Sequence, residues 1–213
     1  MRSTIVLLLL LAAGCAAVPE PPPMCTDSAR TGPLGTRVLR QITYDYPAYP
    51  TPEALAARVE AVVTGRVTGF VAGPVVNEGI PGDRTHYVLM RTRVERRPKG
   101  TTEDVVDVSF YQGAAVDDEG TPHQSVGDFA RAVPAGTRVL LFLNHARQSG
   151  TVVEGQAVRH STPPQGVVLH EVTDDPHGRA VGGRDDVYSS PGWNQPCGID
   201  GLLARLHAHG FTG

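Results

Sequence analysis

The chain has 213 residues, which is enough for one domain with a buried core together with terminal segments. Its formal net charge is −3, so there is no overall positive field to attract nucleic acid, and we expect no nucleic-acid partner. Aromatic residues make up 6% of the chain, whereas Gly and Pro number 24 and 18, a balance that favours short strands and many turns over a helical bundle.

The amino terminus has the pattern of an export signal. Arg2 supplies a positive start, and the apolar run 5–11 is shorter than the roughly 20 residues that span a bilayer. Small residues at 12–14 then precede Cys15. This segment resembles a bacterial lipobox, in which the cysteine thiol receives a diacylglycerol and becomes the first residue of the mature protein. An ordinary secretory signal cleaved near Ala17 is the alternative.

The lipobox resemblance implies a location and a partner for the chain. It implies a lipoprotein signal peptide over residues 1–14, acylation of Cys15, and anchoring in the cell membrane on its extracytoplasmic face. The proline-rich run 19–23 would be a stiff spacer between this anchor and the domain. Cys25 and Cys197 then remain as an even pair in an oxidising compartment, and we expect a disulfide between them. Two unpaired thiols are the alternative.

The next segments predict a strand-rich domain. Residues 37–44 are expected to form a short edge strand in an irregular arm. A helix is predicted over 52–59, because Thr51 is a capping residue and Pro52 and Glu53 favour the first turn. Strands are predicted where Val, Leu, Phe and Tyr gather between turn residues, at 61–71, 87–94, 105–111 and 138–143. Gly65 and Gly69 would let the first strand bend, as a small closed barrel requires.

The remaining elements connect and cover these strands. Residues 75–84 are expected to form a mobile hairpin loop, and a helical turn is expected near Phe129. The apolar run 139–143 predicts a central strand covered on both faces. A last hairpin is expected from 166–172 and 179–181. A final amphipathic helix is predicted from four apolar residues at helical spacing, Ile199, Leu202, Leu203 and Leu206. We expect Gly210 to end this helix and the helix to cover one end of the barrel.

One face of the second strand carries arginines. Val88, Met90 and Val94 alternate with Arg91, Arg93 and Arg97, so the arginines point away from the core. They are a possible binding face for an anion or a polysaccharide. The interpretation we favour is cross-strand pairing with acidic residues such as Asp107 on the next strand.

Taken together, the strand pattern resembles that of a loose group of exported bacterial proteins. It is carried by Val-Thr-Gly-Arg-Val at 63–67, Pro-Lys-Gly at 98–100 and the run 136–143 that ends Leu-Leu-Phe-Leu. That group is similar in barrel topology to OB folds, netrin-like modules and tissue inhibitors of metalloproteinases. The resemblance implies a mainly β fold, a small OB-like Greek-key barrel with a short N-terminal helix and a C-terminal amphipathic helix. Those inhibitors have a Cys-x-Cys amino terminus that this chain lacks, so no protease inhibition is implied.

The sequence contains no recognised catalytic motif. It has no Gly-x-Ser-x-Gly, His-Glu-x-x-His, Cys-x-x-Cys or phosphate-binding loop, and we predict no metal site and no cofactor. His145, His160 and His170 have a spacing that would allow them to meet an acid, Asp174 or Asp175, in the folded chain. Their convergence with an acid in one cleft would favour an enzyme.

These observations define four segments and one preferred function. The segments are a signal peptide (1–14), a tether and arm (15–50), an OB-like barrel (51–197) and a C-terminal helix (198–213). We expect a non-enzymatic lipoprotein of the cell envelope that binds a protein or a glycan. The alternative is a lipid-anchored hydrolase with a His/Asp site.

Overall fold

The computed structural model describes residues 32–40, 48–77, 84–113, 116–117, 120–146, 150–173 and 177–213. The segment predicted to be an export signal, Cys15, the proline-rich run 19–23 and Cys25 lie outside these residues, as do Asp174 and Asp175. No helix within the described ranges has the length and apolar character needed to cross a membrane.

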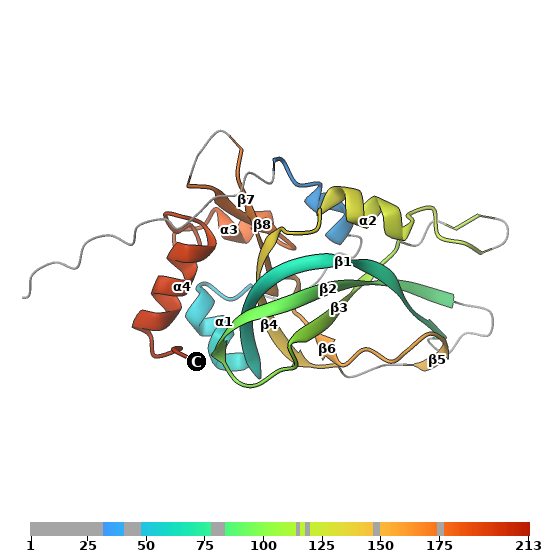
Figure 1. Ribbon diagram of the computed structural model, residues 1–213, viewed down its shortest axis with the longest axis horizontal. Coiled ribbons are helices and arrows are strands. Elements are labelled where there is room, and N and C mark those ends of the chain that lie inside the picture. The colour runs from blue at the N-terminus through green and yellow to red at the C-terminus, as the bar shows by residue number, and fades with distance from the viewer. Residues whose placement is uncertain are drawn as a thin grey trace, which may run out of the picture.

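The fold is mainly β, and its strands form one eight-stranded sheet (Figure 1). The strands are β1 (Ala61–Asn77), β2 (Arg84–Lys99), β3 (Val105–Tyr111), β4 (Arg138–His145), β5 (Thr151–Glu154), β6 (His160–Ser161), β7 (Val167–Glu171) and β8 (Arg179–Gly182). Their order is β5-β1-β2-β3-β6-β4-β7-β8, and β1 also pairs with β4. The pairings therefore lead from β1 through β2, β3, β6 and β4 back to β1, so part of the sheet forms a ring.

An inner hydrophobic cluster fills the space that these strands surround. It takes alternate residues from β1 to β4 and is closed by Phe129 and Val133, which lie in and just after α2 (Val126–Ala132). Ser125 caps this helix, since its hydroxyl accepts from the backbone N–H of Asp128 while the Asp128 carboxylate accepts from the N–H of Ser125. The predicted helical turn near Phe129 is thus a capped helix of two turns.

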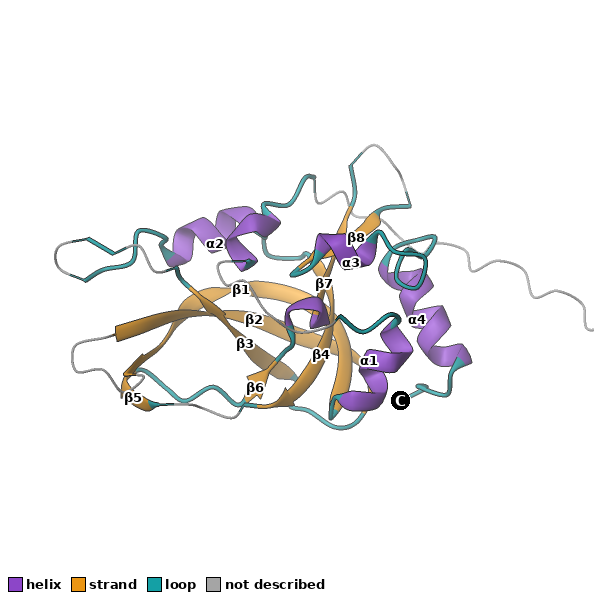
Figure 2. Cartoon of the chain, turned by 180° about the vertical axis from the view of Figure 1, so that it is seen from behind, coloured by secondary structure: helices purple, strands orange, loops and turns teal. Residues whose placement is uncertain are grey.

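A second hydrophobic cluster lies on the opposite face of β1, β4 and β7. Here α1 (Pro52–Arg58) and α4 (Ile199–Ala208) pack beside α3 (Asp185–Tyr188), as the view from behind shows (Figure 2). Trp193 is fully buried among them and contacts Phe142 edge-on, with ring centroids 5.8 Å apart. Both faces of β4 are therefore covered, as predicted. The expectation that the final helix covers one end of the barrel is wrong, because α4 packs on this outer face and α2 contributes to the inner cluster.

The helix α1 has the start that the sequence predicts. The Thr51 hydroxyl accepts from the N–H of Ala54 at 3.2 Å, and Pro52 occupies the first turn. The helix is joined to α4 through Glu53, whose carboxylate accepts two hydrogen bonds from Arg205 at 2.6 and 2.8 Å. This pair connects segments 152 residues apart and fixes the C-terminal helix to the start of the domain.

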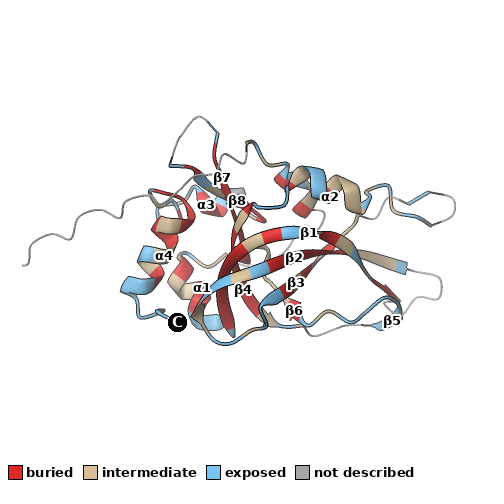
Figure 3. Cartoon of the chain, in the orientation of Figure 1, coloured by how far each residue is buried: buried red, intermediate tan, exposed pale blue. Residues whose placement is uncertain are grey.

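The strand β1 bends at its glycines, and there its backbone lies close to that of its neighbour β2. A Cβ at Gly65 would lie 2.0 Å from the carbonyl oxygen of Arg93, so only glycine allows this approach of the two backbones. The β1–β2 register shifts between Val67 and Gly69, where Gly69 has a φ of 155°. The predicted role of both glycines is confirmed, and Figure 3 shows the curved strand with buried residues along it.

Three local predictions were wrong or incomplete. Residues 36–39 form a 3-10 helix, η1 (Thr36–Leu39), in place of the expected edge strand, and residues 41–47 lie outside the described part of the chain. The expected loop over 75–84 begins later, because β1 continues to Asn77 and β2 already starts at Arg84. The short strands β5 and β6 and the helix α3 were not predicted, because segments of two to four residues carry no periodic signal.

Candidate functional site

Two of the three predicted histidines meet at one edge of the ring. The rings of His145, at the end of β4, and His160, in β6, are nearly parallel, with centroids 6.2 Å apart and planes at 22°. The pairing of β4 with β6 aligns these two residues directly. Both line an open hollow of about 560 Å³ together with Thr101, Thr102, Glu103, Ala146, Val158 and Arg159.

Each histidine has a carboxylate beside it. The Nε2 atom of His160 lies 2.9 Å from Oε2 of Glu103, and the Nε2 atom of His145 lies 3.4 Å from Oε2 of Glu60. The acids that join the histidines are therefore Glu103 and Glu60. The predicted partners Asp174 and Asp175 lie outside the described residues. The sequence offered no signal for either glutamate, since both lie in connections just outside strands.

The Glu103 carboxylate contacts two consecutive residues, Arg159 and His160. Its Oε1 accepts from Arg159 at 3.0 Å while Oε2 contacts His160, whose side chain is 9% exposed. The hydrogen bond with His160, together with hydrogen bonds to the Glu103 backbone and to Arg159, lowers the pKa of Glu103 to about 2. The group is thus an anion throughout the physiological pH range, and it fixes the residues before β6.

Residues 155–160, which we call the strap, lie beside the outer face of β2 and β3. The strap follows β5 and enters β6, and a second hollow of about 230 Å³ lies between it and the two strands. Leu89, Glu103, Val105 and Asp107 line this hollow opposite the strap, and residues 156–160 form the strap side. The strap therefore separates the histidine hollow from a recess on the face of the sheet.

The face next to this recess contains two of the predicted arginines. Arg91 lies opposite Asp107 and donates to both of its carboxylate oxygens, at 3.0 and 3.1 Å. The predicted cross-strand pairing is therefore present for this arginine. Arg97 instead holds the β2–β3 turn, donating to the carbonyls of Thr102 and Glu103 and to Asp104. Arg93 is exposed on the same face as Arg91.

Aromatic and apolar side chains continue this face away from the arginines. The rings of Tyr87 and Tyr111, opposite each other on β2 and β3, have centroids 6.2 Å apart. Leu89 separates this pair from Arg91 along β2, and the exposed Val105 lies opposite Arg93. The outer face of β2 and β3 thus combines a tyrosine pair, the exposed Arg93, the Arg91–Asp107 ion pair and two apolar side chains that line the recess.

The third histidine is not part of this site. His170 lies on β7, is 4% exposed, and its pKa is lowered, first by burial and then by the charge of Arg138. Asp200 of α4 pairs with Arg138 at 2.7 Å and acts in the opposite direction on His170. His170 therefore does not join His145 and His160 at the hollow, because β6 and β7 pair with different parts of β4.

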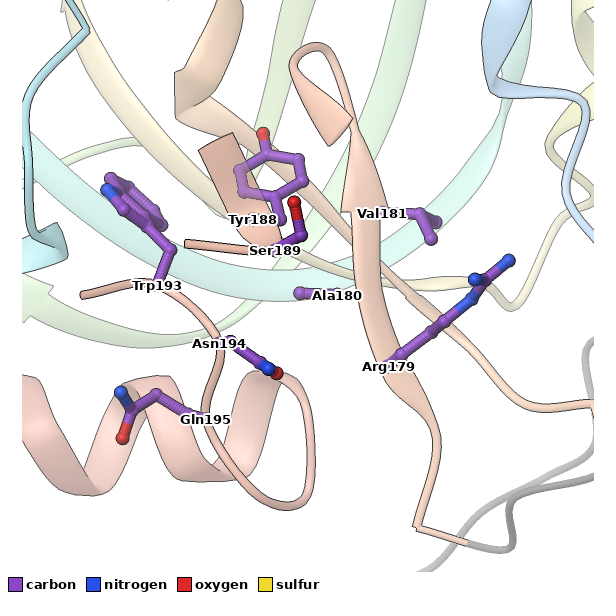
Figure 4. Close-up of a pocket in the computed structure, with 8 residues that line it drawn as sticks. All are labelled: Arg179, Ala180, Val181, Tyr188, Ser189, Trp193, Asn194 and Gln195. Carbon is purple, nitrogen blue, oxygen red and sulfur yellow. The ribbon is translucent and has the colours of Figure 1, made fainter. Parts of the chain in front are cut away.

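A further hollow of about 200 Å³ lies between β8 and the segment before α4 (Figure 4). Two of its aromatic residues use their polar atoms within the fold. The Tyr188 hydroxyl donates to backbone carbonyls at 2.8 and 3.0 Å, and the Trp193 indole N–H donates to the carbonyl of Tyr49 at 2.9 Å. Arg179 pairs with the buried Glu171 and points away from Trp193 (Figure 4). We interpret this hollow as a packing seam.

The other residues singled out in the sequence are placed as follows. Ser189 donates to the carbonyl of Asp186 at 3.2 Å, and so it is part of a turn. Cys197 is buried, and its predicted partner Cys25 lies outside the described residues, as does Cys15, the predicted acylation site. Across the described ranges, no three His, Cys, Asp or Glu side chains are grouped so that they could hold a metal ion.

Comparison with known proteins gives no family for this chain. No family model matches the sequence. No curated protein matches it either.

Proposed function

We propose that this protein is a lipid-anchored binding module of the cell envelope that holds a protein or glycan partner on the outer face of β2 and β3. The observation that carries the proposal is the recess of about 230 Å³ between these strands and the strap, whose lining includes Leu89, Val105, Arg159, Glu103 and Asp107. A lining that mixes apolar side chains with charges of both signs suits recognition of a partner that is partly apolar and partly charged.

The strand order supports an OB-like barrel as the scaffold. The pairings run β1-β2-β3-β6-β4-β1, β3 and β6 are parallel, and α2 lies between β3 and β4 in the chain. OB-like barrels bind ligands on the face of their second and third strands and in the adjacent loops. If the scaffold is OB-like, the recess and the strap would correspond to these positions.

The binding face is tested by photo-crosslinking in intact cells. A photoreactive residue in place of Val105, which is 47% exposed, should capture a discrete envelope partner. Val153 on β5 is equally exposed at 47% and is the matched control, because it lies away from the recess. Equal capture from both positions, or capture from neither, would contradict a partner at this face.

The anchor is tested separately by the Cys15→Ser variant. Removing the thiol leaves no acceptor for a diacylglycerol, so the variant should leave the membrane fraction for the soluble or secreted fraction. The parent protein, expressed at the same level, is the reference. A variant that stays with the membranes as fully as the parent would contradict lipid anchoring.

One observation favours hydrolysis as a second candidate function. His160 and Glu103 lie 2.9 Å apart beside a hollow, and a histidine oriented by a carboxylate is the arrangement that general acid–base catalysis uses. Purified protein would then cleave chromogenic ester or glycoside substrates, and His160→Asn would abolish the cleavage. Ser161, the hydroxyl residue next to His160, donates to the backbone carbonyl of His145 at 3.5 Å, so it supplies no nucleophile in this arrangement and binding remains the preferred function.

A further inference from the structure

Three arginines lie opposite one another across three neighbouring strands. Arg66 on β1 is aligned with Arg93 on β2 and, on its other side, with Arg138 on β4. Residues aligned in this way in antiparallel strands share one face, with Cβ atoms about 4.5–5.5 Å apart. The next residues, Val67 and Val139, belong to the inner cluster, so the three arginines lie on the outer face of the sheet.

Only part of this positive charge is neutralised. Arg138 pairs with Asp200 at 2.7 Å, and Arg66 pairs with Glu95 at 3.0 Å and also donates to the carbonyl oxygen of Gly136 at 3.1 Å. The exposed Arg93 forms no side-chain hydrogen bond or ion pair with any residue that the structure describes. Because like charges placed directly opposite destabilise a sheet, Arg93 sits where its charge opposes folding. An anionic ligand would remove this repulsion.

The arginine row ends at the recess. Arg93 is aligned with Val105 on β3, and Val105 lines the hollow beneath the strap together with Leu89. A ligand that crosses the strands from Arg66 over Arg93 therefore reaches an apolar wall one strand further on. Two cationic side chains on β1 and β2 are followed by the apolar Val105 and Leu89, an order that a chain of charged rings with apolar faces would match.

We propose that the outer face of β1, β2 and β3 binds an acidic polysaccharide, with a carboxylate group on Arg93 and the apolar face of a sugar ring against Leu89 and Val105. Arginine favours such groups because its planar guanidinium donates two parallel hydrogen bonds to a carboxylate. The inference rests on the proposed function, since both use the recess at Val105, and it names the class of ligand. A single sugar chain can enter the recess beneath the strap, which a planar bilayer surface cannot.

The test measures binding of the full-length Cys15→Ser protein, which has no acyl chain that could insert into vesicles, to three immobilised probes. Polygalacturonate, which has one carboxylate per residue, should bind, and its affinity should fall as salt is added because the contacts are charged. Neutral dextran of the same length and phosphatidylglycerol vesicles should not bind measurably. Arg93→Gln should weaken polygalacturonate binding at least about tenfold while raising the midpoint of thermal unfolding by about 1–2 °C.

The control variant is Arg58→Gln, which removes an equally exposed arginine that has no ion pair in the described part of the chain, at the end of α1. It should leave binding unchanged. Binding that survives Arg93→Gln, equal binding to dextran, or binding to the vesicles alone would overturn the inference. If polygalacturonate does not bind while the photoreactive residue at position 105 still captures a partner, the ligand class is wrong and the binding function stands. If polygalacturonate binds but position 105 captures nothing in cells, a cellular partner at this face is contradicted.

Discussion

The carboxylate of Glu103 and the imidazole of His160 lie 2.9 Å apart, although 57 residues separate them in the chain. Glu103 belongs to the turn between β2 and β3, whereas His160 begins β6. Their contact, together with the Glu103–Arg159 pair, fixes the strap beside the outer face of the sheet. The shape of the recess therefore depends on one carboxylate.

Replacing Glu103 with Gln should loosen the strap. Glutamine has one acceptor oxygen, so it cannot receive hydrogen bonds from His160 and Arg159 at two oxygens as the carboxylate does. We expect faster amide hydrogen exchange over residues 155–160 and a loss of global stability below about 1 kcal/mol, because the ion pair is exposed. Glu95→Gln, which removes the exposed pair with Arg66, is the control and should leave exchange in the strap unchanged.

The Glu53–Arg205 pair should make stability depend on pH in the acid range. The hydrogen bonds from Arg205 lower the pKa of Glu53 from 4.5 to about 2. Since the pKa is lower in the folded state, the stabilisation is fully present above pH 4.5 and is lost as the pH falls towards 2.

Urea unfolding of the parent and of Glu53→Gln at several pH values measures this effect. At pH 7 the variant should be less stable by about 1–3 kcal/mol, because it loses a largely buried ion pair between α1 and α4. The difference should shrink to nothing near pH 2. If the difference in unfolding free energy between parent and variant stays constant from pH 7 to pH 2, the charge of the Glu53 carboxylate does not contribute to stability.

Gly65→Ala should be among the most destabilising single substitutions in the sheet. Its Cβ would lie 2.0 Å from the carbonyl oxygen of Arg93, and the atom it meets belongs to the backbone, so β1 and β2 would have to separate. We expect a loss of about 2–3 kcal/mol in denaturant unfolding. Gly127→Ala in α2 is the matched control: its Cβ meets nothing closer than 3.4 Å, and it should be neutral or stabilising by about 0.5 kcal/mol.

The predicted disulfide between Cys25 and Cys197 is tested by thiol labelling. In the denatured, unreduced mature protein neither residue should react with a maleimide, and both should react after reduction. Cys197→Ser should then release one reactive thiol at Cys25 and lower the stability by about 2–4 kcal/mol. Labelling of Cys25 in the unreduced parent would refute the bond.

The sequence by itself determined the secondary structure wherever one physical signal was strong and local. The strand at 105–111 was predicted with its observed bounds, because alternating Val and Phe require one buried face. Thr51 and Pro52 fixed the start of α1, and the unbroken run 139–143 predicted a strand covered on both faces. Gly65 indicated a close backbone contact without indicating the partner.

The tertiary structure alone decided which residues come together. The strap, the meeting of His160 with Glu103, and the alignment of Arg66 with Arg93 all depend on strand pairing between segments far apart in the chain. Nothing local specifies such pairing, because register follows from the combined burial of whole strands. The same cause explains the misplaced final helix: its apolar stripe requires a surface to pack on, and only the assembled sheet shows that this surface is the outer face of β4 and β7.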